Sequence, residues 1–214
     1  MKKRSVEEWY PITYKNTQHI EEMFLPHYTG KGIFLDIGTN AGAVIDRVLN
    51  YFPKAYVEGF EPVPKFWDYL DKKYEGTNVV INKFGLGHKN FTTSIHVHPK
   101  HLGWNEIGYA SPHNQEIEIK ILDEVLKQKK IYKGIEFIKI DVEYFEPFVI
   151  IGLENYFSNN KDNLPYILIE HNWQSSPYQK EQTKIYTWLQ NYYFPFEYDK
   201  ITGTQDILLK PKNK

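Results

Sequence analysis

Residues 34–42 decide the fold class and read Phe34-Leu35-Asp36-Ile37-Gly38-Thr39-Asn40-Ala41-Gly42. An apolar strand here runs into a glycine turn, and the turn leads into a helical segment. Gly38 and Gly42 let a ligand approach the main chain, and backbone N–H groups at the start of a helix favour an anionic group. The spacing is G-x-x-x-G, not the G-x-G-x-x-G of dinucleotide sites, and the lysine of a P-loop is missing. Asp36 would repel a pyrophosphate but accepts hydrogen bonds from an ammonium group or a hydroxyl. The stretch therefore favours a nucleoside cofactor over a plain strand–helix turn.

A second acidic residue follows the next predicted strand, in Glu58-Gly59-Phe60-Glu61-Pro62. Glu61 lies 23 residues after Gly38. An acid at about this distance falls at the tip of the neighbouring strand, where its carboxylate accepts both hydroxyls of a ribose. Pro62 stiffens the turn. The alternative is that Glu61 caps the helix that starts near Pro64. Taken together, Glu61 and the glycine turn favour a nucleoside site.

Strands and helices alternate along most of the chain. The sequence predicts strands over residues 33–36, 55–60, 78–84, 135–141 and 166–170. It predicts helices over residues 41–52, 64–74, 122–128 and 147–157, and one more that begins at Ser176 with Gln179 as its capping-box partner. One or two helices are expected within residues 5–28, and a hairpin from residues 196–198 and 206–209. This order predicts an α/β fold: a largely parallel sheet, helices on both faces, and a ligand site at the carboxyl ends of the strands.

The middle of the chain has a different pattern. Residues 91–98 and 115–121 alternate like exposed strands, and Pro99, Gly103 and Pro112 interrupt the segment between them. We therefore predict an insertion or long loop over residues 88–114, a feature that is usually functional or mobile.

Composition excludes several classes of protein. The chain has 214 residues, 26 basic against 27 acidic, and no cysteine. The balanced charge disfavours nucleic-acid partners, and the lack of cysteine rules out disulfides, thiolate metal sites and a cysteine nucleophile. The first ten residues have no apolar core of a signal peptide, and no apolar run approaches the ~20 residues that span a bilayer. We expect a cytoplasmic protein without a membrane span.

Polar side chains gather where the fourth and fifth core strands end. The two stretches read Asp141-Val142-Glu143-Tyr144-Phe145-Glu146-Pro147 and Glu170-His171-Asn172-Trp173. We interpret Glu146 as compensating the charge at a helix N-terminus. His171, whose ring titrates near neutral pH, and Asp141 are the candidates for a general base. Glu143 and Glu170 would orient the base or the acceptor.

A metal ion is an alternative use of the same edge. Four side chains there offer oxygen and nitrogen ligands for Mg²⁺ or a similar ion: Asp141, Glu170, His171 and Asn172. We favour a reaction without a metal ion, because no obligatory chelating pair is expected of the ligand. His96, His98 and His101 form H-x-H-x-x-H, but no carboxylate follows at a matching spacing, so we predict no metal site there.

Four motifs, in this order and spacing, resemble the successive signatures of the FkbM-type S-adenosylmethionine-dependent methyltransferases. They are residues 35–42, 60–62, 122–123 and 138–147. The resemblance implies a class I, Rossmann-like methyltransferase fold with a seven-strand, mostly parallel sheet and a C-terminal antiparallel hairpin. It divides the chain into an N-terminal helical extension, residues 1–30, and a methyltransferase domain, residues 31–214. The family usually has glycine where this chain has Tyr144, so a bulky ring would alter the acceptor pocket.

The same resemblance assigns roles to residues. Asp36, Gly38, Asn40 and Gly42 would hold the methionine part of S-adenosylmethionine, and Glu61 the ribose. Phe84, Gly85 and Leu86 would lie near the adenine. The remaining residues that we assign to the cofactor site are Thr39, Pro62 and Asp141.

The acceptor is expected to be a hydroxyl of a sugar, a glycan or another small molecule. The family resemblance implies O-methylation, and the aromatic content of 16% suits ligands with a flat apolar face and polar edges. Trp104, Tyr109 and Trp173 would stack on a sugar ring, although packing in the core or in loops explains them equally well. The alternatives are an NAD-dependent oxidoreductase and a catalytically inactive Rossmann-like binding module.

Overall fold

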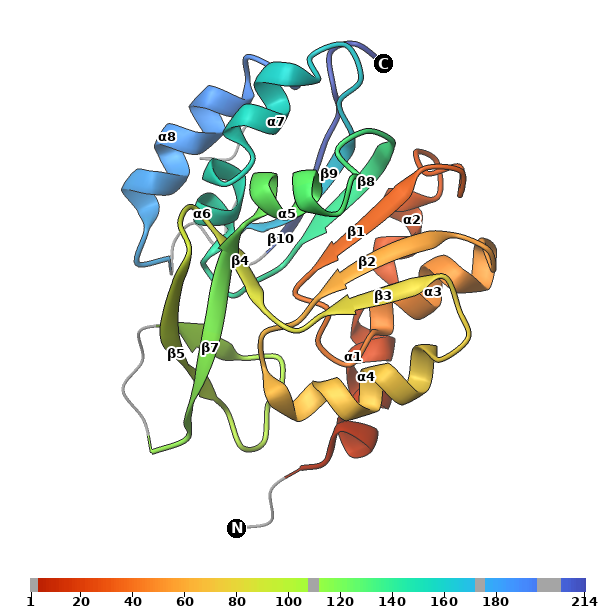
Figure 1. Cartoon of the computed structure of the whole chain (residues 1–214), viewed down its shortest axis with the longest axis vertical. Helices are drawn as coiled ribbons and strands as arrows, with labels where there is room; N and C mark the ends of the chain where they lie inside the picture. Colours follow the sequence, from red (N-terminus) through yellow and green to blue (C-terminus); the bar gives the residue numbers. More distant parts are fainter. Residues whose placement is uncertain (1–3, 108–111, 172–175, 196–204) are drawn as a thin grey trace.

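The chain is built on a six-stranded sheet with the strand order β10-β9-β8-β1-β2-β3 (Figure 1). The computed structural model describes residues 4–107, 112–171, 176–195 and 205–214. The strands are β1 (Ile33–Ile37), β2 (Tyr56–Phe60), β3 (Val79–Asn82), β8 (Ile135–Ile140), β9 (Tyr166–His171) and β10 (Gln205–Leu209). The first five pair in parallel, which confirms the predicted parallel sheet. β10 runs antiparallel to β9 at the edge.

Helices cover both faces of this sheet, and each face has its own apolar core (Figure 1). One face carries α1 (Val6–Asn16), α2 (His19–Phe24), α3 (Ala43–Tyr51), η1 (Pro64–Phe66) and α4 (Trp67–Tyr74). The other carries α5 (Leu122–Gln128), α6 (Glu146–Ile151), α7 (Glu154–Asn159) and α8 (Gln179–Leu189). Successive strand residues point to opposite faces, so Phe34 and Phe137 pack toward α1–α4, whereas Leu35 and Ile138 pack toward α5–α8. No helix within the described ranges is long and apolar enough to cross a membrane.

The predicted seven-strand sheet is reproduced only in part. Within the described ranges the main sheet has six strands, and residues 196–198, predicted as one arm of the hairpin, lie outside those ranges. The predicted strand over residues 78–84 ends at Asn82, and the chain then leaves the main sheet. It enters a second sheet with the order β4-β7-β5-β6.

The second sheet occupies the segment predicted as an insertion or long loop. It consists of β4 (Gly85–Gly87), β5 (Phe91–Val97), β6 (Asn105–Ile107) and β7 (Asn114–Ile121). β5 and β7 confirm the two exposed strands predicted there. Their alternation has a physical cause, because Ile95, Val97, Ile117 and Ile119 join the core beneath α1–α4 while the polar residues between them face outward.

Two helix predictions are wrong in detail. The helix predicted over residues 147–157 is two helices, α6 and α7, separated at Gly152 and Leu153. The predicted N-cap at Ser176 does not begin a helix. α8 starts at Gln179, and the Ser176 hydroxyl instead accepts a hydrogen bond from the Tyr178 N–H.

Candidate active site

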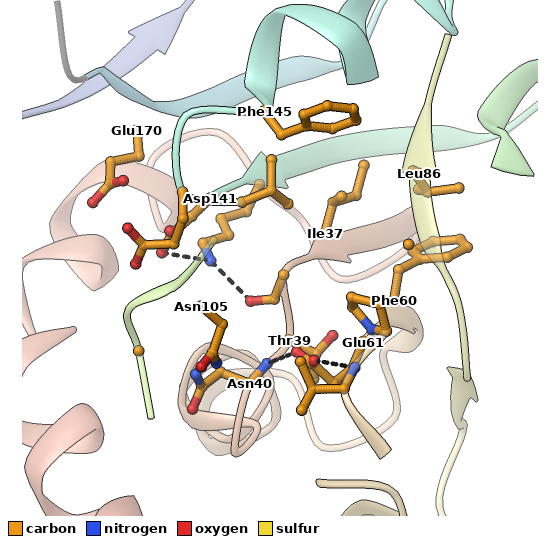
Figure 2. A pocket seen from close by; sticks show the side chains of 18 of the residues that line it. Ile37, Thr39, Asn40, Phe60, Glu61, Leu86, Asn105, Asp141, Phe145 and Glu170 are labelled. Carbon is orange, nitrogen blue, oxygen red and sulfur yellow. Dashed lines mark hydrogen bonds and ion pairs between the residues drawn. The ribbon is translucent and has the colours of Figure 1, made fainter. Parts of the chain in front are cut away.

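A cavity opens at the carboxyl ends of β1, β2, β8 and β9, where the parallel sheet was predicted to hold a ligand (Figure 2). It encloses about 970 Å³ of space that is partly open to solvent. Ten residues predicted from the sequence line it: Gly38, Thr39, Asn40, Glu61, Pro62, Gly85, Leu86, Asp141, Glu143 and Glu170. Figure 2 shows an acidic end with Asp141 and Glu170, and a second polar group formed by Thr39, Asn40 and Glu61.

The glycine turn depends on left-handed backbone. Gly38 and Gly42 have φ angles of 85° and 78°, and Asn40 has 51°. A Cβ on Gly38 would lie 1.8 Å from the carbonyl oxygen of Asp141, so only glycine fits there. Gly42 does not line the cavity, and its missing side chain makes room for the Tyr74 hydroxyl. Gly38 therefore shapes the ligand site, whereas Gly42 serves packing.

Glu61 is fixed by the turn that it faces. It is 4% exposed, and its two carboxylate oxygens accept hydrogen bonds from the Asn40 N–H at 2.7 Å and the Val63 N–H at 2.8 Å. Burial raises the pKa of Glu61 to about 7. Each oxygen has a second lone-pair direction available, so the carboxylate can still accept two hydroxyl groups from the cavity.

A buried lysine links the glycine turn to the acidic end. Lys139 Nζ lies 3.0 Å from Asp141 Oδ2 and 3.8 Å from Asp36 Oδ1, and it donates a hydrogen bond to the Gly38 carbonyl. Although burial opposes its charge, Asp141 and Asp36 raise the pKa of Lys139 above its usual range. Lys139 was not predicted for the site. The available signal was a lysine near the end of a strand whose other residues, apart from Glu136 near its start, are apolar.

Asp36 lies beneath the cavity and is not part of its wall. It is fully buried beside Lys139, its partner in the pairing of β1 with β8. Its oxygens receive no hydrogen bond from any described residue. Burial raises the pKa of Asp36 to about 6, and this effect outweighs the opposing charge of Lys139. Asp36, predicted to hold the methionine part of the cofactor, therefore lies against Lys139 and not in the cavity wall.

Three carboxylates form the acidic end of the cavity: Asp141, Glu143 and Glu170. The Asp141 side chain is 34% exposed and reachable from the cavity. Burial and the charge of Asp141 raise the pKa of Glu143 and of Glu170 well above that of an ordinary glutamate. Glutamates in this state keep their proton at neutral pH and can donate a hydrogen bond.

The turn after β8 holds two non-glycine residues in left-handed conformation. Glu143 has a φ of 52° and Tyr144 a φ of 74°. Glu146 stabilises this turn, since its fully buried carboxylate accepts a hydrogen bond from the Val142 N–H at 2.9 Å in the first turn of α6. The Tyr144 ring does not line the cavity. Its position is one where glycine is conformationally favoured.

The structure places His171 away from the cavity. The ring is fully buried, with Nδ1 3.2 Å from the Tyr186 hydroxyl of α8, and His171 does not belong to the cavity wall. Of the two candidates for the general base, the geometry therefore argues against His171 and not against Asp141. Asn172 and Trp173, assigned to the same edge, lie outside the described residues.

Two metal sites were considered from the sequence, and the one at the strand ends includes Asn172, which lies outside the described residues. In the described part of the chain, no cluster of three or more metal-binding side chains is arranged to hold an ion. Asp141, Glu170 and His171 form no such cluster, and neither do the histidines at positions 96, 98 and 101.

Phe84 was assigned to the adenine region together with Gly85 and Leu86. The latter two line the cavity, but Phe84 does not. Its ring packs edge-on against Phe60, and Lys120 Nζ lies over it at 4.3 Å. The cavity wall also includes three residues that were not predicted for the site: Gly103 in the β5–β6 connection, and Asn105 and Ile107 of β6.

Comparisons with known proteins give a family match and similar solved structures. The model of the FkbM methyltransferase domain matches residues 36–196. The chain is similar to the crystal structure of methyltransferase FkbM from Methylobacillus flagellatus KT, with 16% identity and a TM-score of 0.52, over 85% of this chain and 44% of that one. It thus spans less than half the length of that relative.

A chain in the crystal structure of a fibrillarin/Nop5p complex has 12% identity and a TM-score of 0.52, over 95% of this chain and 84% of that one. No curated protein matches. At these identities the solved structures establish the fold, an α/β fold like that of class I methyltransferases, and the family model establishes the relationship. The chain belongs to the FkbM methyltransferase domain family.

Proposed function

We propose that the chain is an S-adenosylmethionine-dependent O-methyltransferase whose acceptor is a hydroxyl of a sugar or glycan. The observation that carries the proposal is the acidic lining of the cavity. Of its described lining residues, Glu61, Asp141, Glu143 and Glu170 are acidic and Lys139 alone is basic. S-adenosylmethionine carries a sulfonium and an ammonium group, and both suit a wall rich in carboxyl oxygen atoms, including those of carboxyls that keep their proton. The pyrophosphate of NAD would meet a single cation in the described wall, Lys139.

The residues present fit the cofactor. Glu61 would accept the ribose hydroxyls, the turn at Gly38 and Asn40 would hold the methionine part, and Gly85 and Leu86 would flank the adenine. When bound, S-adenosylmethionine supplies an electrophilic methyl group. Lys139 keeps Asp141 and the Gly38 carbonyl in fixed positions, so the protein meets both cofactor and acceptor with little rearrangement.

Asp141 is our candidate for the base that removes the acceptor proton. It is exposed to the cavity and anchored by Lys139. Glu143 and Glu170 retain protons at neutral pH because their pKa values are raised, so each can donate a hydrogen bond to the acceptor. His171, buried against Tyr186, is left with a structural role.

An exposed aromatic surface next to the cavity supports a carbohydrate acceptor. Trp104 is 59% exposed and stacks on His101 with ring centroids 4.6 Å apart. Its sequence neighbours, Gly103 and Asn105, line the cavity. A flat ring at the cavity margin suits the apolar face of a sugar. Tyr109, named for the same role, lies outside the described residues.

Two further assignments stay proposals. We place the boundary of the N-terminal helical extension at residue 30, and we expect the enzyme to work in the cytoplasm without a metal ion. Turnover that survives a chelator supports the metal-free route. Turnover lost to a chelator and restored by Mg²⁺ or Mn²⁺ would refute it.

Calorimetric titration with S-adenosylhomocysteine and with NAD tests the cofactor. We expect binding of S-adenosylhomocysteine only. Glu61→Gln should weaken that binding about tenfold or more, because a charge-assisted hydrogen bond is lost. Glu116→Gln, on the exposed side of β7, is the matched control. Binding of NAD alone would indicate an oxidoreductase, and binding of neither ligand an inactive module.

Radiolabelled methyl transfer to a panel of sugars, glycans, peptides and nucleic acids tests the reaction. Asp141→Asn should lower kcat by ~10²–10⁴-fold while S-adenosylhomocysteine binding changes little. Transfer to peptides or nucleic acids but to no carbohydrate would overturn the acceptor assignment.

A further inference from the structure

The side chain of Asn40 is held by two segments from outside the alternating strands and helices. Trp9 Nε1 of α1 donates a hydrogen bond to Asn40 Oδ1 at 3.0 Å. Asn40 Nδ2 donates to the Leu102 carbonyl at 2.7 Å, in the connection between β5 and β6. The Asn40 N–H also donates a hydrogen bond to Glu61, the carboxylate proposed to bind the ribose. We call the two side-chain hydrogen bonds of Asn40, from Trp9 and to Leu102, the clamp. The clamp is therefore one residue away from the ribose subsite.

The two segments that hold Asn40 are joined to each other. The Arg4 guanidinium donates to the Lys100 carbonyl and lies 5.6 Å from the Trp9 ring, and the Arg4 N–H donates to the Pro99 carbonyl. Gly103 packs against Trp9 so closely that a Cβ there would lie 3.2 Å from the ring. α1 and the β5–β6 connection therefore behave as one body at the glycine turn.

This body also forms part of the cavity wall. Thr13 and Thr17, at the end of α1, line the cavity, and so do Gly103 of the β5–β6 connection and Asn105 at the start of β6. Trp9 itself is buried and does not line the cavity, so its route to a ligand is the hydrogen bond to Asn40.

We infer that Trp9 is a positioning residue of the cofactor site: its indole N–H fixes Asn40 and thereby completes the methionine and ribose subsites from the N-terminal helix. The inference rests on the proposed function. Its physical basis is that Asn40 has left-handed backbone, which a side chain bonded on both its oxygen and its nitrogen holds in place. Without the Trp9 bond, Asn40 Oδ1 would keep only the hydrogen bond from the Ala41 N–H, so part of the cost of ordering Asn40 would fall on cofactor binding.

Trp9→Phe is the decisive variant, because it keeps an aromatic ring at this position and removes the N–H donor, together with the part of the indole that packs against Gly103. Trp188→Phe, on α8 and away from the cavity, is the matched control. Calorimetry with S-adenosylhomocysteine should show Trp9→Phe binding about threefold to tenfold more weakly, the effect of one hydrogen bond. Trp188→Phe should bind like the parent protein.

Hydrogen exchange gives a readout that does not depend on turnover. In the parent protein, S-adenosylhomocysteine should slow exchange of the α1 amides, and in Trp9→Phe this protection should be reduced. If Trp9→Phe does not fold, Arg4→Ala is the second variant. It removes the hydrogen bond to the Lys100 carbonyl and the contact with the Trp9 ring, and it should also weaken S-adenosylhomocysteine binding.

The outcomes separate the two proposals. A parent protein that does not bind S-adenosylhomocysteine refutes the proposed function. A parent protein that binds, with Trp9→Phe binding equally well and α1 exchange unaffected by the ligand, leaves the function standing and overturns the role of Trp9. A lower melting temperature with unchanged affinity would likewise reduce Trp9 to a structural residue.

Discussion

Lys139 is a buried cation in β8 whose charge is compensated by two neighbouring carboxylates. It is 3% exposed, and its ammonium group is compensated by Asp36 on one side and Asp141 on the other. Asp36 is itself fully buried and lacks hydrogen-bond donors among the described residues. Each charge is therefore acceptable only while the other is present.

Removing the lysine alone should be costly. Lys139→Met would leave Asp36 buried without a cation, and we expect the free energy of unfolding at pH 8 to fall by about 3–5 kcal/mol. The double variant Asp36→Asn/Lys139→Met should recover most of that loss, because it removes both charges.

Urea unfolding measures both variants. Lys83→Met serves as the control, since Lys83 pairs with Asp71 on the surface and an exposed pair contributes only about 0–1 kcal/mol. A loss no larger than that of the control, or a double variant as unstable as the single one, would show that the buried pair is unimportant.

Sequence reasoning located the strand ends but not the directions of their side chains. Glu170 follows Leu168 on the α1–α4 face and enters the cavity, whereas His171 follows Ile169 on the α5–α8 face and is buried. In a parallel sheet both faces are apolar, so the sequence has no visible alternation from which to choose between them. This is why Asp141 was placed correctly at the cavity and His171 was not.

At the scale of elements, Asp123 explains why one predicted helix is two. Its carboxylate accepts hydrogen bonds from the Asn155 N–H at 3.0 Å and the Tyr156 N–H at 2.8 Å, which are free donors in the first turn of α7. Asp123 lies in α5, far away in sequence, so a local pattern cannot reveal this cap. The strands β4 and β6 were missed for a related reason, since three residues are too few to show a period.

Removing this cap should loosen α7. Asp123→Ala leaves two amides without their acceptor, one of them in the buried Tyr156, and we expect a loss of about 1–3 kcal/mol in the free energy of unfolding. Asp123→Asn, which keeps one acceptor oxygen, should lose less. Chemical denaturation with the exposed Asp162→Ala as control tests the ranking. Equal stability of Asp123→Ala and the control would mean that α7 needs no cap.

The whole molecule combines a nearly neutral formal charge with a strongly acidic interior. Net charge is −1, yet carboxylates gather under and around one cavity. Folding concentrates them because the parallel strands end at one edge of the sheet, and β1, β2, β8 and β9 each have an acidic residue at or near that end. The interior should consequently control how stability responds to pH.

The folded protein, without ligand, should become more stable as the pH falls from about 8.5 to 6.5. Burial raises the pKa of Glu61 and of Glu146 to about 7 and that of Asp36 to about 6, above the ~4 of an unfolded chain. In this window the folded state therefore binds more protons than the unfolded state, and the free energy of unfolding rises as protons are added. Below pH 6.5 the free energy of unfolding should continue to rise until the carboxyls of the unfolded chain also take up protons near pH ~4. His27 and His88 offset part of this gain, because burial lowers the pKa of each ring and the unfolded chain then takes up those protons more readily.

Thermal melts across this pH range, with Glu146→Gln beside the parent protein, provide the measurement. The glutamine can still accept the Val142 N–H but has no charge to bury, so the variant should melt higher at pH 8.5 and vary less with pH. Glu116→Gln, exposed on β7, should follow the parent curve. A melting temperature that is flat or falls from pH 8.5 to 6.5 in the parent protein would contradict the argument. It would mean that the carboxylates around the cavity are solvated or paired well enough to stay ionised in the folded state.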